Sequence, residues 1–171
     1  MAQEQQSEVW MRGPIRGVPA LLQPVAHALL QAKEEVTLYM ADFDDRYLWQ
    51  RPGGVAAVGF HLKHMAGVID RLFTYAEDRP LSEAQFAYLR AEGEAVPESR
   101  GAALVSAFAE RVDWAIRQLQ RTDESQLTHA RYLGRKRIPT TLIGLLFHAA
   151  EHTQRHVGQL LVTVRLLVER G

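Results

Sequence analysis

The chain has 171 residues, of which 47% are apolar and 23% charged, and it contains no cysteine. A chain of this length fits one domain and can bury roughly 70% of its unfolded surface. Twenty basic side chains balance twenty acidic ones, so net charge favours neither nucleic acid nor an anionic membrane as a partner. Without cysteine there is no disulfide, no thiolate metal ligand and no cysteine nucleophile. Any thiol chemistry therefore requires a thiol from outside.

The first nine residues are polar and lack the basic start and apolar run of a secretory signal. No run approaches the roughly eighteen continuous apolar residues of a membrane span. We expect a cytoplasmic protein that has no membrane partner. It should form a single domain over residues 1–171, with residues 1–12 flexible.

Four long stretches with apolar residues at helical spacing predict an all-α fold. Prolines and glycines separate them, and the expected helices cover residues 18–41, 55–77, 99–121 and 140 to the C-terminus. A short extra helix is expected from Ser82 to about Ala91, because Ser82 and Gln85 have the spacing of a capping box. Ser99 is the expected cap of the third long helix, and Pro139 or Thr140 should open the last one. These elements predict a helical bundle with long loops.

Two connecting segments complete the predicted organisation. Residues 92–97 are expected to form a linker, and residues 128–139 an extended segment with a turn at Gly134. The second segment contains the basic sequence RYLGRKR (131–137). Acidic segments elsewhere balance this charge, so we expect a solvated loop and no nucleic-acid partner. No phosphate-binding loop, dinucleotide fingerprint or nucleophile elbow is present in the sequence.

Three histidines follow one another at i,i+4 steps on the last predicted helix, in HAAEHTQRH. Steps of one turn place His148, His152 and His156 on one side of the helix. The outer two are about 12 Å apart along the axis, so only two adjacent ones can share a metal ion. His152 and His156 lie further round towards the core than His148. We therefore expect His152 and His156 to be ligands and His148 to be a spare.

The second predicted helix carries a further pair of histidines, in GFHLKHMAG. On a helical wheel His61 lies roughly 60° from the centre of the apolar face and His64 roughly 120°. This arithmetic favours His61 as the inward residue, but a site beside a neighbouring helix uses the flank of the face. Both histidines therefore stay candidates on spacing alone. Three imidazoles would suit a divalent transition metal such as zinc, nickel or ferrous iron and leave positions open for water or substrate.

The sequence resembles the DinB-like (DinB/YfiT) superfamily of metal-dependent enzymes over nearly its whole length. The segments that carry the resemblance are LWQRPGG, FHLKHMAGVIDRLFTYAE and RKRIPTTLIGLLFHAAEHTQRHVGQL. The resemblance implies a four-helix bundle in up-down-down-up order. It also implies a metal held by His64, His152 and His156, with His61 and His148 as alternates. Many members carry an arginine after the last ligand, where this chain has Val157.

The resemblance implies a class of chemistry without a substrate. The understood branches of this superfamily are transferases and isomerases that use a low-molecular-weight thiol. We therefore expect a transferase acting on a small-molecule substrate. A hydrolase with metal-activated water and a non-enzymatic, stress-related metal-binding protein are the alternatives. No residue is a clear general base, and the catalytic residues are not assigned. Gln159 and Tyr75 are candidates to support the ligands, and a homodimer is the expected assembly.

Overall fold

The computed structural model describes residues 7–169 and contains four long helices, one short helix and a β-hairpin. The long helices are α1 (Gln23–Tyr39), α2 (Val58–Ala76), α4 (Gly101–Leu119) and α5 (Leu142–Val168). The short helix is α3 (Glu83–Ala91), and the hairpin consists of β1 (Ala130–Leu133) and β2 (Ile138–Thr141). Single 3-10 turns lie at Val9–Arg12, Ala20–Leu22, Asp45–Tyr47, Pro52–Gly54 and Glu124–Gln126.

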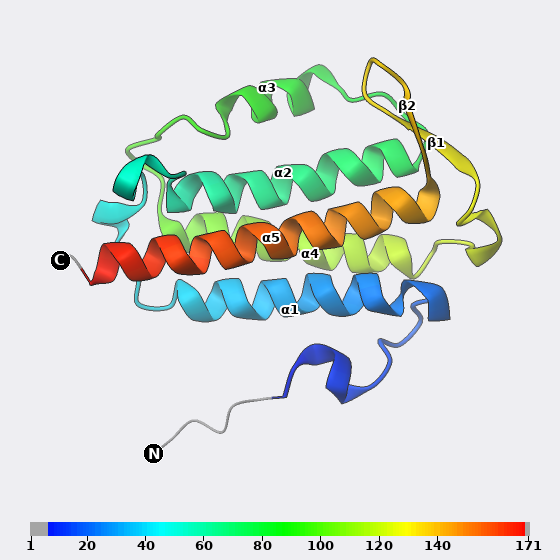
Figure 1. Ribbon diagram of the computed structural model, residues 1–171, viewed down its shortest axis with the longest axis horizontal. Helices are drawn as coiled ribbons and strands as arrows, with labels where there is room; N and C mark the ends of the chain where they lie inside the picture. Colours follow the sequence, from blue (N-terminus) through cyan, green and yellow to red (C-terminus); the bar gives the residue numbers. More distant parts are fainter. Residues whose placement is uncertain (1–6, 170–171) are drawn as a thin grey trace.

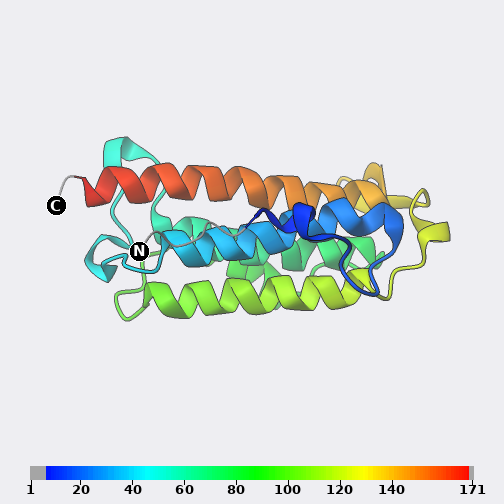
Figure 2. The ribbon, with the colours of Figure 1, turned by 90° about the horizontal axis from the view of Figure 1, so that it is seen from below.

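The four long helices form a bundle in up-down-down-up order, which confirms the expected topology. In Figure 1, α1 and α5 run in one direction and α2 and α4 in the other. Helix α1 packs on α5 and α4, and α2 packs on the same two helices; Figure 2 shows α1 between α4 and α5. Because α2 and α4 are parallel, a long crossover must connect them. This crossover contains α3, which lies along the outside of α2 (Figure 1).

The interior of the bundle is filled by apolar side chains that recur at helical spacing. The largest fully buried ones come from all four long helices and include Leu29, Val36, Leu62, Met65, Ile69, Phe108, Leu119, Leu146 and Leu160. Burial of one such side chain stabilises the fold by roughly 1.5–3 kcal/mol. The apolar stripes on which the helical prediction depended are therefore the stripes that meet in the core.

The starts of three helices show which local predictions hold. Ser82 and Gln85 form the expected capping box at the start of α3. Ser99 is not the cap of α4: the carboxylate of Asp45 accepts the hydrogen bond from Gly101 N at 2.7 Å instead. Helix α5 begins at Leu142, two residues after the expected start at 140, because β2 continues to Thr141, whose hydroxyl caps the helix.

The segment expected to be extended forms the antiparallel hairpin, which adds a small β element to the helical bundle. Its register pairs Ala130 with Thr141 and Leu133 with Ile138. The turn lies at Gly134, as expected, with a positive φ of 66°. The fold is thus a four-helix bundle with a hairpin at one end (Figure 1).

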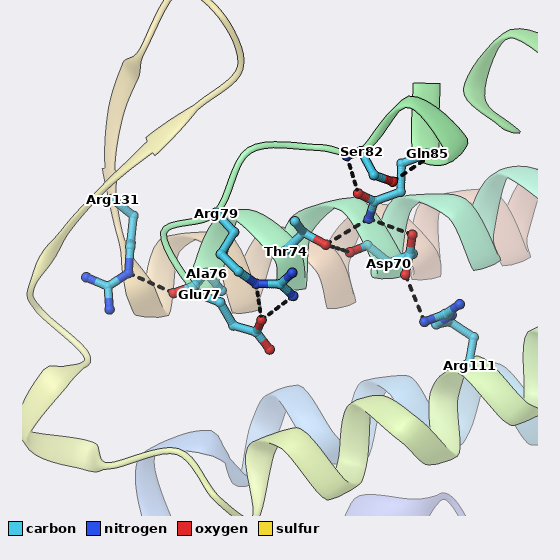
Figure 3. A network of polar contacts seen from close by, with 9 residues as sticks. All are labelled: Asp70, Thr74, Ala76, Glu77, Arg79, Ser82, Gln85, Arg111 and Arg131. Carbon is cyan, nitrogen blue, oxygen red and sulfur yellow. Dashed lines mark hydrogen bonds and ion pairs between the residues drawn. The ribbon is translucent and has the colours of Figure 1, made fainter. Parts of the chain in front are cut away.

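Polar contacts fasten α3 and the hairpin to α2, as Figure 3 shows. The side-chain amide of Gln85 donates to Asp70 Oδ2 at 2.7 Å and to Thr74 Oγ1 at 2.8 Å. Arg111 of α4 forms an ion pair with the same Asp70 at 2.8 Å. Arg131 of β1 donates from Nε to the carbonyl oxygen of the last residue of α2 at 2.7 Å. These contacts fix α3 over the outer face of α2 and the hairpin at its C-terminal end.

The N-terminal stretch expected to be flexible, residues 1–12, lies partly outside the described residues, which begin at residue 7. Within its described part Val9 is buried, and Arg12 forms an ion pair with Glu34 of α1 at 2.6 Å. Between residues 7 and 169, no helix is both long and apolar enough to cross a lipid bilayer.

Candidate metal centre

Three histidines from two helices meet where α2 packs against α5. One ring nitrogen each of His64, His152 and His156 lies within 4.8 Å of the others. The Nε2 atoms of His64 and His152 are 3.1 Å apart, and the ring centroids of His64 and His156 are 4.5 Å apart. The structure thus brings together the three residues that the resemblance implied. His64 of α2 and His152 of α5 are 88 residues apart in the sequence.

His61 is the inward residue of its pair, as the helical wheel predicted, but it does not belong to this group of three. Its exposed fraction is only 3%, and its Nδ1 lies 3.0 Å from Nδ1 of His156. His64 lies on the flank of the α2 apolar face, where that flank meets α5. His61 lies close to His156 alone, whereas His64 lies close to both His152 and His156, and this double contact, rather than depth in the core, places His64 in the cluster.

His148 faces solvent, as expected of the spare histidine. Its side chain is 46% exposed, and its Nδ1 pairs with Glu151 Oε1 at 2.6 Å. Glu151 also forms an ion pair with Arg155 at 2.7 Å. His148, Glu151 and His152 make a second group with ligand atoms within 4.8 Å of one another, but the ion pairs already occupy its carboxylate.

Burial favours the neutral form of three histidines at this site, His61, His152 and His156. Removal from water, together with smaller effects of the nearby His64, His152 and His61, lowers the pKa of His156 to about 3. Burial likewise lowers the pKa of His61 to about 4, with a smaller effect from His64, and it lowers the pKa of His152. Since only a neutral imidazole has a free lone pair, these rings are in the state that binds a metal ion.

A buried carboxylate that the sequence did not single out holds His64. Glu92, at the C-terminal end of α3, is 2% exposed. Its Oε2 lies 2.7 Å from His64 Nδ1, and its Oε1 accepts a hydrogen bond from Arg71 Nη1 at 2.5 Å. A carboxylate oxygen beside an arginine can only accept, so the ring proton of His64 lies on Nδ1. In the neutral ring the lone pair is then on Nε2, which faces His152.

Residues 92–97 lie between α3 and α4, as expected of a linker, but Glu92 at its start is buried against α2. Lys63 donates to the carbonyl oxygen of Ala91, and the Tyr88 hydroxyl donates to that of Lys63 at 3.0 Å. Gly67 makes room for the carboxylate, since a Cβ at this position would lie against Glu92 Oε1 and 2.6 Å from Arg71 Nη1. A glycine one helical turn after His64 is the local signal of this close approach.

The hydrogen bonding of the cluster fits a shared cation. His64 Nε2 carries a lone pair, so His152 either donates to it from Nε2 or aims a second lone pair at the same point. In both cases His152 Nδ1 is buried without a hydrogen-bond partner in the described part of the chain. The second arrangement is the one in which both Nε2 lone pairs can bind a shared cation. Three neutral imidazoles are a donor set that zinc, nickel and ferrous iron accept.

The expected supporting residues, Gln159 and Tyr75, lie on opposite sides of the cluster. Gln159 is exposed and lines a pocket of about 590 Å³ that reaches His61. Tyr75 lines a different pocket, of about 250 Å³, that reaches His152, and burial raises the pKa of its phenol. Within residues 7–169 neither side chain hydrogen-bonds a cluster histidine, whereas Glu92 does.

The pocket beside His152 is mostly apolar and lies between α2, α3, α5 and the hairpin. Its apolar lining consists of Val68, Leu72, Tyr75, Leu81, Phe86, Leu89 and Leu133, and its polar lining of Arg71, His148 and His152. A concave apolar site with a few convergent polar groups is the usual form of a small-molecule site.

Comparisons with known proteins agree with this architecture. The model of the DinB superfamily matches residues 20–160. A conserved protein from Enterococcus faecalis shares the fold with a TM-score of 0.68 and 20% identity, covering 89% of this chain and 99% of its own. YfiT from Bacillus subtilis, described as a probable metal-dependent hydrolase with an unusual four-helix bundle topology, gives a TM-score of 0.63 and 16% identity over 91% of this chain and 93% of its own. No curated protein sequence matches the chain. Because the family model spans most of the sequence, the chain belongs to the DinB superfamily.

Proposed function

We propose that this protein is a metal-dependent enzyme in which His64, His152 and His156 bind one divalent transition metal ion, zinc, nickel or ferrous iron. The observation that supports this most directly is the convergence of three imidazoles, one of them fixed by the buried carboxylate of Glu92. Membership of the DinB superfamily is consistent with it. Three protein ligands leave coordination positions open, which is the pattern of catalytic rather than structural sites.

The reaction that we favour is transfer of a small external thiol to an electrophilic substrate. A metal in this position lowers the pKa of a bound thiol or water and so supplies a nucleophile at neutral pH. The nearby carboxylates are occupied, Glu92 by Arg71 and His64, and Glu151 by His148 and Arg155. A free thiol has a pKa of about 8.5, so it needs less help from a protein base than water does. The lack of a free carboxylate base therefore favours a thiol.

The chain's own residues have separate roles in this proposal. Glu92 keeps the His64 proton on Nδ1 and so directs the lone pair of Nε2 into the site. The apolar pocket beside His152 receives the electrophile and excludes water from it. Arg71 faces this pocket while it holds Glu92.

Hydrolysis is the second candidate, and the structural likeness to YfiT, a probable metal-dependent hydrolase, is the observation that favours it. The same histidines would then serve a reaction with water and no thiol. The two candidates differ in one measurable property, which is the dependence of the rate on an added thiol.

The test is a rate measurement on the wild type, His152→Ala and the control His129→Ala, which removes an exposed histidine outside the cluster. Conjugation of several low-molecular-weight thiols to 1-chloro-2,4-dinitrobenzene and hydrolysis of p-nitrophenyl acetate without thiol are followed in parallel. We expect a thiol-dependent rate in the wild type and the control that is lost in His152→Ala. Ester turnover without thiol, lost in the same variant, would favour the hydrolase. Wild-type rates equal to those of His152→Ala in both assays would contradict both candidates.

The homodimer and the cytoplasmic location expected from the sequence stay predictions. Size-exclusion chromatography with light scattering on the full chain tests the first of them directly.

A further inference from the structure

Two pockets adjoin at the end of the bundle where the hairpin lies. The first, of about 250 Å³, reaches His152. The second, of about 410 Å³, lies between the C-terminal end of α2, the start of α3 and the hairpin turn. Both are lined by Tyr75, Leu81 and Phe86. We call the two together the channel, which leads from the histidine cluster to the hairpin.

The two parts of the channel differ in chemistry. The part near His152 is lined mainly by leucines, a valine and two aromatic rings. The part at the hairpin is lined by Arg79, Arg135 and Arg137, with Asp78 as the opposing charge. Arg79 is already neutralised by Glu77, as Figure 3 shows. The free positive charge of the channel therefore comes from the hairpin turn.

The two turn arginines are held over aromatic rings instead of by carboxylates. Arg135 lies 5.2 Å from the ring centroid of Phe86, a wall of the channel. Arg137 lies 4.2 Å from the ring centroid of Tyr132. Neither arginine has a carboxylate oxygen within 4.0 Å among residues 7–169. Both guanidinium groups thus keep hydrogen-bond donors available for an anion.

The backbone of the turn supports a specific role for this segment. Arg137 has a φ of 48°, a left-handed conformation that is unusual for a residue with a side chain. A hydrogen bond from Arg137 N to Gly134 O closes the turn at 3.0 Å. Arg131 fastens the base of the hairpin to the end of α2. The turn therefore presents its arginines from a defined backbone conformation.

We propose that the channel binds a small organic carboxylate with an apolar body as the substrate of this site. Its apolar body packs between Leu72, Leu81 and Phe86, its carboxylate is bound by Arg135 and Arg137, and its reactive end points to the histidine cluster. The electrophile, rather than the thiol, occupies the channel, because a small polar thiol gains little from an apolar wall. The reaction at the inner end rests on the proposed function, whereas the binding selectivity does not.

The test compares two ligands that share an apolar body and differ in charge, 4-phenylbutyrate and 4-phenylbutan-1-ol. Each is titrated into the nitrogen-15-labelled protein, and binding is followed by amide chemical shifts. We expect the carboxylate to bind roughly tenfold more tightly than the alcohol, as expected for a charge-assisted contact, with shifts in β1, β2 and α3. The double variant Arg135→Gln/Arg137→Gln should remove this difference and leave the alcohol unaffected. Arg121→Gln, an exposed arginine outside the channel, is the matched control and should behave as the wild type.

A further variant tests the sign of the electrostatic argument. Asp78→Asn removes the opposing charge of the channel, so it should strengthen binding of 4-phenylbutyrate and not of the alcohol. Equal affinities of the wild type for the two ligands would overturn the proposal. An equal loss of affinity for both ligands in the arginine double variant would also overturn it. Displacement of 4-phenylbutyrate by glutathione would also overturn it, because the channel would then take the thiol. The titration needs neither metal nor turnover, so its outcome is separate from the success or failure of the proposed function.

Discussion

Replacement of Glu92 by glutamine changes one atom of a buried side chain and should disturb the histidine cluster from outside it. The glutamine has nearly the same volume, so the packing of α3 on α2 is kept. Its amide has one oxygen and one nitrogen where the carboxylate had two acceptors. If the oxygen accepts from Arg71, the amide nitrogen faces His64 Nδ1, and two donors would meet. His64 relieves this conflict by moving its proton to Nε2, where the proton blocks the lone pair that a metal ion needs.

The magnitude follows from the contacts that are lost. A residue that orients a metal-binding histidine typically contributes 10- to 100-fold in metal affinity, and we expect a loss in this range for Glu92→Gln. The charge-assisted contact of His64 with Glu92, whose side chain is only 3% exposed, becomes a hydrogen bond between two neutral groups. A hydrogen bond to a charged group contributes about 1.5–3 kcal/mol to stability. The free energy of unfolding of the metal-free protein should fall by at most about 3 kcal/mol, because Arg71 still donates to the oxygen of the glutamine.

The assay is a competition titration of zinc against a chromophoric chelator, together with urea unfolding of the metal-free protein. Glu110→Gln is the matched control, because Glu110 is an exposed glutamate of α4. The control should have wild-type affinity and stability. A zinc affinity of Glu92→Gln within about twofold of the wild type would refute the argument that Glu92 sets the protonation of His64.

Three further predictions concern the support of the cluster, the fold and pH. Gly67→Ala should weaken zinc binding without changing a ligand, because the added Cβ displaces Glu92; wild-type affinity in the same titration would contradict this. Asp45→Ala should lower the free energy of unfolding by about 1 kcal/mol, the usual contribution of a helix cap, and leave zinc affinity unchanged; equal urea midpoints would count against the cap. Burial lowers the pKa of His61 to about 4 and that of His156 to about 3, from an ordinary value of 6.5. The unfolded chain therefore binds protons first, and the metal-free protein should lose stability as pH falls below about 6.5; a pH profile unchanged in His61→Asn would contradict this origin.

Much of the fold and part of the site could be predicted because they depend on periodicity. The i,i+4 spacing of His152 and His156 fixes their common side of α5, and the polar residues around them indicate which side faces inward. The same arithmetic favoured His61 on α2, and His61 is indeed buried. Membership of the cluster depends on where α5 crosses α2, which no single helix encodes. The resemblance to a family supplied that information for His64.

The features that the sequence analysis missed are contacts between distant segments. Asp45 caps α4 from 56 residues away, so the local candidate Ser99 was the natural but wrong choice. Glu92 was assigned to a linker because it follows the predicted short helix. A pattern was nevertheless present: Gln85, Tyr88 and Glu92 lie at i, i+3 and i+7, on one face of α3, and all three bind α2 or its histidine.

The most direct test of the metal centre is elemental analysis of the full chain purified without an affinity tag. The wild type and His148→Ala should each contain close to one transition-metal ion per chain, and His156→Ala should contain almost none. A wild type without metal, or equal metal content in all three proteins, would contradict the assignment of His64, His152 and His156 as ligands.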